Sequence, residues 1–382
     1  MPSFEVAIPW WQEAGPVVDG ARVRFGLEVT ILRLLTAERD RPHGGAVTYM
    51  AEVDPAAPAV IASRFEPWAG SLDDDPHRAP WARPGGPAAD LRWAQGVLAG
   101  RGMARGGPAR QIRSWNLSSL WKLPLADGSS AWLKAVPPFF AHEGAMLERL
   151  AGGPVPGLIG RDRHRILMPE LPGEDQYDAV RPVLDRMIDT LVELQAAWVG
   201  RESELLELGL PDWRGPALSA AIADVVERHA REMSIGDVEA LHEFLDTLPG
   251  RFGAVAACGI ADTLVHGDFH PGNVRADGDR ITLLDWGDCG LGHPLLDEAA
   301  FLDRVPPGDV DGLRALWHER WRDALPGSDP KRASRLLAPV AAARQAVIYR
   351  RFLDGIEPSE HPYHRADVPD WLKRTAAILR EG

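Results

Sequence analysis

The sequence predicts an α+β fold in which a strand-rich first part is followed by a mostly helical second part. Up to about residue 173, short runs of β-branched and large apolar residues alternate with polar turns. From about residue 174, helical apolar spacing dominates, and one β-like interruption at Thr263–Leu284 breaks the helical run. From these changes in the sequence pattern we expect three regions, which comprise residues 1–107, 108–173 and 174–382.

Composition limits the classes of function. The 382 residues are 45% hydrophobic and 25% charged, the mix of a globular protein with a real core. A net charge of -13 repels phosphate backbones and anionic lipid, so we expect neither nucleic acid nor membrane as a partner. No apolar run approaches the roughly 18–20 residues that span a bilayer, and Met1–Gln12 lacks the layout of a signal peptide.

Cysteine usage agrees with a reducing compartment. Cys258 and Cys289 are the only cysteines, too few for a disulfide scaffold or a four-thiolate zinc site. We therefore expect a cytoplasmic protein, and the sequence leaves its oligomeric state open.

The region 1–107 reads as mixed helix and strand. Val29–Leu35 and Ala46–Val53 are β-like stretches on either side of the polar turn Glu38–Gly45, which predicts a hairpin or meander. Glu66–Ala89 is dense in Pro, Gly and Asp and reads as an irregular surface loop. A short helix is expected at about Ala88–Leu98.

The other predicted elements follow from the same periodicities. Between residues 110 and 172 we expect paired strands at Ile112–Leu125 and Ser130–Val136, a helix at Ala141–Ala151 and a short strand at Arg165–Met168. Later in the chain we expect helices at Val180–Val199, Pro216–Met233, Asp237–Leu248, Asp309–Leu325 and Lys331–Leu353.

The β-like interruption carries residues suited to phosphoryl transfer. It contains His266-Gly267-Asp268, Asn273 five residues after the aspartate, and an apolar stretch that ends in Asp285-Trp286-Gly287. Phosphoryl transfer needs a carboxylate that orients the acceptor hydroxyl, and hard oxygen ligands that hold Mg²⁺ against the phosphates. Asp268 suits the first task, and Asn273 and Asp285 suit the second.

These motifs resemble the aminoglycoside phosphotransferase family, whose relatives include choline, fructosamine and sugar kinases. The resemblance implies a bilobal protein-kinase-like fold with a β-rich N-lobe and a mostly helical C-lobe, here preceded by an N-terminal α+β cap region. It implies that Asp268 is the catalytic base and that Asn273 and Asp285 are metal ligands. It also implies that His266 braces the loop and that Asp297 opens a helix and supports that loop.

The resemblance extends to the nucleotide site. Lys134, on an apolar strand, matches the lysine that holds the α- and β-phosphates, and Glu143 matches the helix glutamate that positions it, with Glu148 as a substitute. Ser118 and Ser119 fall in a phosphate-covering loop that has no glycine. Met168, Glu170 and Leu171 fall in the lobe-connecting hinge, whose backbone groups would bind adenine.

The sequence thus predicts a kinase that uses Mg²⁺ with ATP or GTP as donor and a small molecule as acceptor. An amino sugar, an aminoglycoside-like antibiotic and a plain sugar remain open as acceptors, with Asp288 and the segment 354–367, including Tyr363, as candidate contacts. The alternative is a nucleotide-binding regulatory module without turnover. A third reading, a metal-dependent hydrolase, would use His266 and His270 as zinc ligands.

Overall fold

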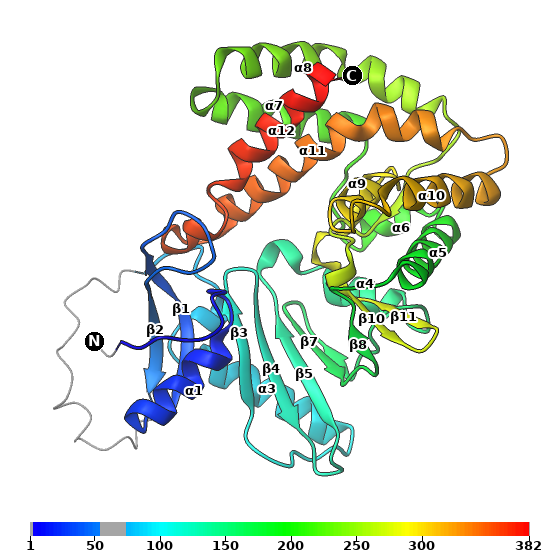
Figure 1. The fold of residues 1–382 in the computed structure, drawn as a ribbon. Helices are drawn as coiled ribbons and strands as arrows, with labels where there is room; N and C mark the ends of the chain where they lie inside the picture. The colour runs from blue at the N-terminus through cyan, green and yellow to red at the C-terminus, as the bar shows by residue number, and fades with distance from the viewer. Residues whose placement is uncertain (1–2, 54–73, 382) are drawn as a thin grey trace. The chain divides into compact units, whose positions relative to one another are not determined.

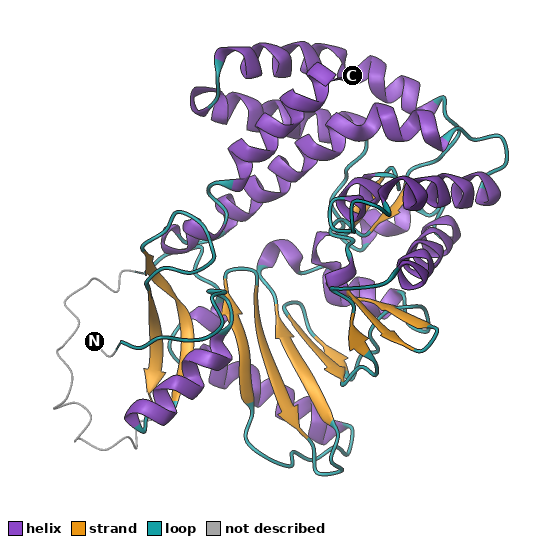
Figure 2. Cartoon of the chain, in the orientation of Figure 1, coloured by secondary structure: helices purple, strands orange, loops and turns teal. Residues whose placement is uncertain are grey.

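The computed structural model describes residues 3–53 and 74–381, and the chain forms two compact units. Unit 1 comprises Met1–Ala141, Leu158–Glu170 and Phe352–Ala366. Unit 2 comprises His142–Gly157, Leu171–Arg351 and Asp367–Gly382. The strands of unit 1 and the helices of unit 2 can be followed in Figures 1 and 2.

Unit 1 is built on a five-stranded sheet with the strand order β3-β4-β5-β7-β6, all neighbours antiparallel. Its strands are β3 (Arg110–Trp115), β4 (Ser118–Pro124), β5 (Ser130–Ala135), β6 (Gly160–Arg161) and β7 (Arg165–Pro169). Helix α3 (Gly86–Gly100) covers one face of this sheet, where Ala94 and Leu98 pack against Trp121, Leu123 and Leu133 (Figure 1). Alternating burial along β5 places its even-numbered residues on the other face.

The first 53 residues join this sheet through α1 (Ala14–Phe25) and the antiparallel pair β1 (Val29–Ala37) and β2 (Val47–Val53). The Gln111 side chain of β3 accepts a hydrogen bond from the Ile31 N–H at 2.8 Å and donates one to the Ile31 carbonyl at 2.7 Å. The Ser114 hydroxyl donates to the Leu32 carbonyl at 3.1 Å. A buried amide and hydroxyl thus take the place of a regular ladder between β1 and β3.

A late segment of the chain completes unit 1. The Glu360 carboxyl accepts a hydrogen bond from the Leu34 N–H at 3.2 Å. The ring of Tyr363, 4% exposed, packs edge-on against Trp11 and Trp115, with 5.6 Å between ring centroids in each pair. Residues 357–364 therefore serve internal packing, and the interpretation of Tyr363 as a stacking surface for an acceptor is wrong.

Unit 2 is mostly helical. Its helices are α4 (Glu143–Arg149), α5 (Arg181–Ala197), α6 (Glu202–Glu207), α7 (Gly215–His229), α8 (Ile235–Ala256), α9 (Leu296–Leu302), α10 (Val310–Ala324), α11 (Pro330–Gly355, up to Arg351) and α12 (Asp367–Glu381). Two small antiparallel groups of strands lie among them: β8 (Glu174–Asp175), β10 (Val274–Asp277) and β11 (Arg280–Leu283) in one, β9 (Thr263–Val265) and β12 (Gly290–Gly292) in the other.

The predicted α+β fold is confirmed, with strands concentrated early in the chain and helices late. The expected hairpin of 29–53, the helix after residue 86 and the helices that became α4, α5, α7, α10 and α11 are present. Part of the predicted loop Glu66–Ala89 lies outside the described residues.

Two expectations about elements need correction, and three helices were not expected. The expected strand Ile112–Leu125 is two antiparallel strands, because the chain turns at Asn116-Leu117. The helix expected to end at Leu248 continues through Pro249 to Ala256. Helices α1, α6 and α12 were not predicted, and α1 illustrates why: its exposed face carries Val23, so that its apolar spacing is weak.

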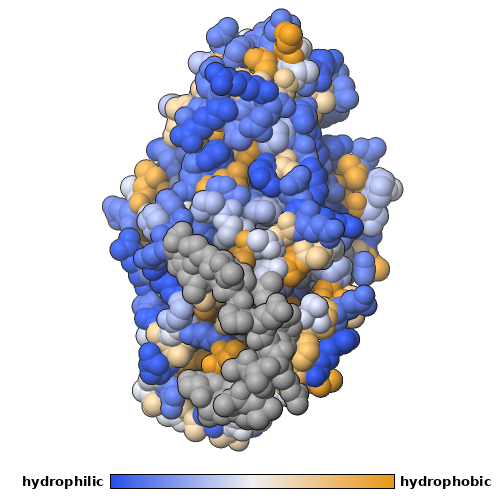
Figure 3. All heavy atoms as spheres, turned by 90° about the vertical axis from the view of Figure 1, so that its left-hand side faces the viewer, coloured by the Kyte–Doolittle hydropathy of each residue, from blue (hydrophilic) through white to orange (hydrophobic). Residues whose placement is uncertain are grey.

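Hydrophilic residues predominate on the face drawn in Figure 3, and hydrophobic residues are scattered over it in small groups. Within residues 3–53 and 74–381, no helix combines the length and apolar character needed to cross a membrane.

The buried carboxyl of Glu360 gives unit 1 a pH-dependent stability. Burial raises the pKa of Glu360 from 4.5 to about 8. At a pH between these two pKa values, the carboxyl is protonated in the native state and ionised in the unfolded chain. The free energy of unfolding therefore falls as the pH rises through this range. We expect Glu360→Gln to flatten the fall in melting temperature between pH 5 and 8, as measured by calorimetry. The exposed control Glu239→Gln should keep the parent slope, and an unchanged slope in Glu360→Gln would contradict the assignment.

Candidate active site

A buried carboxylate organises the loop that carries Asp268. Asp297, in the first turn of α9 and 1% exposed, accepts the backbone N–H of His266 and of Gly267, each at 2.8 Å. Gln195 of α5 donates a third hydrogen bond to the same carboxyl at 2.8 Å. Two backbone amides bound by one carboxylate fix the direction in which the chain enters the loop. The expected support by Asp297 is therefore present.

Two further contacts hold the same turn. Gly267 has φ +91°, and a Cβ atom there would lie 2.0 Å from the Asp288 carbonyl oxygen, so this position accepts glycine alone. The guanidinium of Arg344 on α11, 1% exposed, donates to the carbonyls of Gly267 at 3.3 Å and Asp288 at 3.4 Å. The His266 ring is buried and lies 2.8 Å from the Leu284 carbonyl, which agrees with a bracing role.

Asp268 and Asn273 face each other across the turn that Pro271 begins. The Asn273 amide nitrogen donates to the Asp268 carbonyl at 2.9 Å and to its carboxylate at 3.0 Å. His270 Nε2 lies 3.6 Å from the same carboxylate. Desolvation raises the pKa of Asp268, but the hydrogen bond and charge of His270 outweigh it and lower the pKa to about 2. Asp268 is thus ionised at neutral pH.

Asp285 stands on a strained turn next to this pair. Among the residues that the structure describes, it is the only non-glycine with a positive φ, at +56°. Such a conformation costs about 1–2 kcal/mol and persists where the surroundings enforce it. Here the Leu284 N–H donates to the Asn273 carbonyl at 2.8 Å, and the Leu283 N–H donates to the Pro154 carbonyl at 2.7 Å. These bonds tie the two predicted metal-ligand residues to one another through the backbone, and Asp285 remains exposed.

The turn after Asp285 carries the carboxyl of Asp288 and contacts helix α4. Burial and the charge of Asp268 raise the pKa of Asp288 to about 7, although Arg344 and Arg351 act against this shift. Glu143, 2% exposed, begins α4 in the same unit, and its charge acts on Cys289, directly after Asp288. Glu143 therefore lies in unit 2 near the Asp285 turn, whereas Lys134 belongs to unit 1.

Lys134 lies on the central strand of the unit 1 sheet. It pairs with Leu120 on β4 and with Ile166 on β7, and its side chain is half-buried on the face opposite α3. Flanking residues Leu133 and Ala135 are buried in the core. The strand context predicted for this lysine is therefore confirmed, and its role stays a prediction.

Ser118 and Ser119 begin β4, directly after the turn at Asn116-Leu117. Their hydroxyl oxygens accept hydrogen bonds from the indole N–H groups of Trp115 and Trp121, at 3.1 and 3.0 Å. Asn116 Oδ1 lies 2.9 Å from the Nε2 of His364, both buried. Side chains fix the shape of this glycine-free turn, and contacts of Ser118 and Ser119 with phosphate remain a prediction.

The hinge residues are divided between the two units. Met168 pairs with Trp132 within the sheet, and the Glu170 N–H donates to the Ser130 carbonyl at 2.9 Å. The Glu170 side chain forms an ion pair with Lys122 at 2.9 Å. Leu171 begins the next stretch of unit 2. The Glu170 N–H is thus engaged in the sheet, and contacts of these three residues with a nucleotide base stay a prediction.

Sequence reasoning missed Arg344, Arg351 and Gln195 as parts of this site. All three lie on long helices at ordinary helical positions, distant in sequence from Asp268, and no local pattern marks them. His270 was noted only as half of a possible zinc pair with His266. The structure engages the His266 ring with the Leu284 carbonyl and places His270 against Asp268.

Comparisons with known proteins show the family of the chain. The model of the Phosphotransferase enzyme family matches residues 125–336, more than half of the chain. A comparison with curated protein sequences finds no significant match.

Solved structures of similar fold are numerous. Macrolide 2'-phosphotransferase MphH from Brachybacterium faecium is 19% identical with a TM-score of 0.51, covering 77% of this chain and 99% of its own. Aminoglycoside phosphotransferase APH(4)-Ia, solved with ADP and hygromycin B, is 17% identical with a TM-score of 0.51, covering 76% and 98%. Ethanolamine kinase from Plasmodium vivax is 10% identical with a TM-score of 0.54, covering 85% and 95%.

These likenesses support a protein-kinase-like phosphotransferase fold, and the resemblance drawn from the sequence is confirmed. On the match over residues 125–336, this chain belongs to the Phosphotransferase enzyme family.

Proposed function

We propose that this protein is a small-molecule kinase that transfers the γ-phosphoryl group of ATP or GTP to a hydroxyl of a sugar, amino sugar or aminoglycoside-like acceptor. The observation that carries the proposal is the hydrogen-bonded pair of Asp268 and Asn273, tied through the backbone to Asp285. Similar folds that were solved with ADP or an ATP analogue together with hygromycin B support a nucleotide donor and a small-molecule acceptor.

Asp268 serves as the base in this proposal. Its carboxylate takes the proton of the acceptor hydroxyl while the hydroxyl oxygen attacks the γ-phosphorus. The bond from the γ-phosphorus to the bridging oxygen breaks, and the nucleoside diphosphate leaves. A base with a pKa near 2 is fully ionised at neutral pH, and its main contribution is to orient the hydroxyl.

Asn273 and Asp285 fit a magnesium site. Because the Asn273 amide nitrogen is used by Asp268, its Oδ1 atom is the end of the side chain that can bind a cation. The exposed carboxylate of Asp285 supplies a second hard oxygen, as Mg²⁺ requires. When bound, Mg²⁺ neutralises the charge that develops on the phosphates.

Lys134 and Glu143 complete the donor site in the proposal. The ammonium of Lys134 would bind the α- and β-phosphates, and Glu143 would orient it. The amides and hydroxyls of Ser118 and Ser119 would cover the phosphates. The backbone of Met168, Glu170 and Leu171 would bind the base. Asp288, beside Asp268, is the candidate contact for an amine or hydroxyl of the acceptor.

Loss of the base should abolish turnover and spare nucleotide binding. For Asp268→Asn we expect about a 10²–10⁴-fold lower rate constant, because the amide cannot take a proton. A coupled assay of diphosphate release over amino sugars and antibiotics measures the rate, and calorimetry with MgATP measures binding. The exposed control Asp246→Asn should match the parent. An Asp268→Asn variant that kept a tenth of the parent rate would contradict the proposal. A parent that binds MgATP but phosphorylates no acceptor would favour the non-catalytic module.

Removal of the supporting carboxylate should act on the rate through the loop. An asparagine at 297 offers one oxygen to two backbone N–H groups, so one buried donor loses its partner. We expect Asp297→Asn to lose about 1–3 kcal/mol of unfolding free energy and to lower the turnover number more than it raises the KM for the nucleotide. Asp303→Asn, at an exposed carboxyl paired with Arg374, is the control and should stay within about 0.5 kcal/mol of the parent. Wild-type turnover in a folded Asp297→Asn variant would refute the role of this carboxylate.

A further inference from the structure

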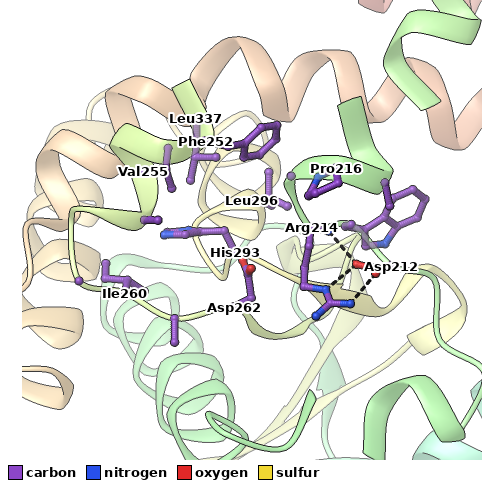
Figure 4. Close-up of a pocket in the computed structure, with 16 residues that line it drawn as sticks. Asp212, Arg214, Pro216, Phe252, Val255, Ile260, Asp262, His293, Leu296 and Leu337 are labelled. Atoms are coloured by element: carbon purple, nitrogen blue, oxygen red, sulfur yellow. Dashed lines mark hydrogen bonds and ion pairs between the residues drawn. The ribbon is translucent and has the colours of Figure 1, made fainter. Parts of the chain in front are cut away.

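A pocket of about 790 Å³ lies within unit 2, separate from the residues of the candidate active site. The loop before α7, the end of α8 and the residues before β9 line it, and none of Asp268, Asn273 or Asp285 does. Figure 4 shows the side chains around it. Its volume falls in the range of about 300–1,000 Å³ that small-molecule sites occupy.

The walls of this pocket are largely apolar. Val255, Ile260 and Leu296 are buried, and Phe252 and Leu337 add further apolar surface. Such walls stabilise the apolar part of a ligand because each buried group is removed from water.

Two lining residues of the pocket, His293 and Trp213, carry a buried side-chain nitrogen without a hydrogen-bond partner among the described residues. The His293 ring is 4% exposed, and burial lowers the pKa of His293 to about 3, so the ring is neutral. Its Nδ1 accepts the Leu295 N–H at 3.3 Å, which places the ring proton on Nε2. Nε2 finds no hydrogen-bond partner among the residues that the structure describes. The His293 ring therefore carries an N–H donor that an oxygen of a ligand would satisfy.

Carboxylates outnumber cations at the same pocket. Arg214 is engaged by Asp212, with bonds of 2.9 and 2.7 Å to its two oxygens. Asp262, half-buried in the lining, has Arg214 as its neighbouring cation and lies within the influence of Asp212 and Glu202. Burial raises the pKa of Asp262, Arg214 opposes the shift, and the two acids add to it. A cationic group beside Asp262 would offset this excess of negative charge.

We propose that this pocket binds a small amphipathic amine that carries a hydroxyl or ether oxygen. The ammonium forms an ion pair with Asp262, and the oxygen accepts a hydrogen bond from the His293 Nε2–H. The apolar body fills the space between Val255, Leu296 and Leu337. This site is independent of the proposed phosphoryl transfer.

The test is calorimetric titration of the full chain with 2-phenylethanolamine, which combines a ring, a hydroxyl and an ammonium. We expect one saturable site. 1-Phenylethanol, which lacks the amine, and phenethylamine, which lacks the hydroxyl, should each bind about tenfold more weakly, since each loses one polar contact.

Two variants locate the binding. Asp262→Asn should weaken the affinity about tenfold. Ala256→Phe, which places a ring at an exposed small residue of the pocket lining, should abolish binding. The controls Asp246→Asn and Ala257→Phe, at exposed positions of the same helix and its end, should bind like the parent.

Asp268→Asn should also bind the amine like the parent, which separates this site from an acceptor site. Absence of binding at millimolar amine overturns the proposal. So does binding that Asp262→Asn and Ala256→Phe leave unchanged, because the amine would then be held elsewhere. Loss of binding in Asp268→Asn alone would likewise overturn it and assign the amine to the acceptor site.

Discussion

The hydrogen bonds of the Asp297 carboxylate are the interactions on which the loop that carries Asp268 depends. This carboxylate lies in the protein interior, accepts two consecutive backbone N–H groups and receives the Gln195 amide. Burial raises the pKa of Asp297 to about 6, although the hydrogen bonds from Gly267, His266 and Gln195 and the charge of Arg344 act against this shift. With the backbone of His266 and Gly267 held there, the next residue, Asp268, projects toward Asn273. The buried carboxylate of Asp297 thus fixes the backbone of the loop, and the loop backbone in turn positions the carboxylate of Asp268.

In unit 1, side chains join the segments that the backbone pairing of the sheet does not connect. The Gln111 side chain of β3 forms a hydrogen bond with the backbone of β1. The Glu360 carboxyl accepts one from the Leu34 N–H, and the side chains of His364 and Asn116 form another. A buried cluster of charges adds to this: Glu357 pairs with Arg78 at 2.9 Å and with Arg33 at 3.5 Å. Single substitutions in such a network leave a buried partner unsatisfied, so its members are strongly coupled.

Local patterns predicted the parts of this protein whose structure is set locally. The hairpin of residues 29–53, the helix after residue 86 and the strand of Lys134 follow from the alternation of apolar and polar residues, from helical apolar spacing and from polar turns. The positive φ of Asp285 and the insertion of Arg344 arise from packing between segments far apart in the chain, which one sequence does not display. The turn at Asn116-Leu117 contains no glycine or proline, so that local patterns did not mark it, and only the family resemblance, which placed Ser118 and Ser119 in a loop, indicated it. Tyr363 and Glu360 were read as surface residues because their partners, Trp11 and Leu34, lie more than three hundred positions earlier.

The turn between β3 and β4 has a thermodynamic consequence. The side chains of Ser118, Ser119 and Asn116 are held by contacts with Trp115, Trp121 and His364, respectively. A glycine-rich flap loses conformational entropy when it closes over phosphates, whereas a turn of fixed shape has little left to lose. In the proposed kinase, binding of a nucleotide against this turn would therefore carry a small entropic penalty, and discrimination among donors would rest on how well the ligand matches a preformed surface.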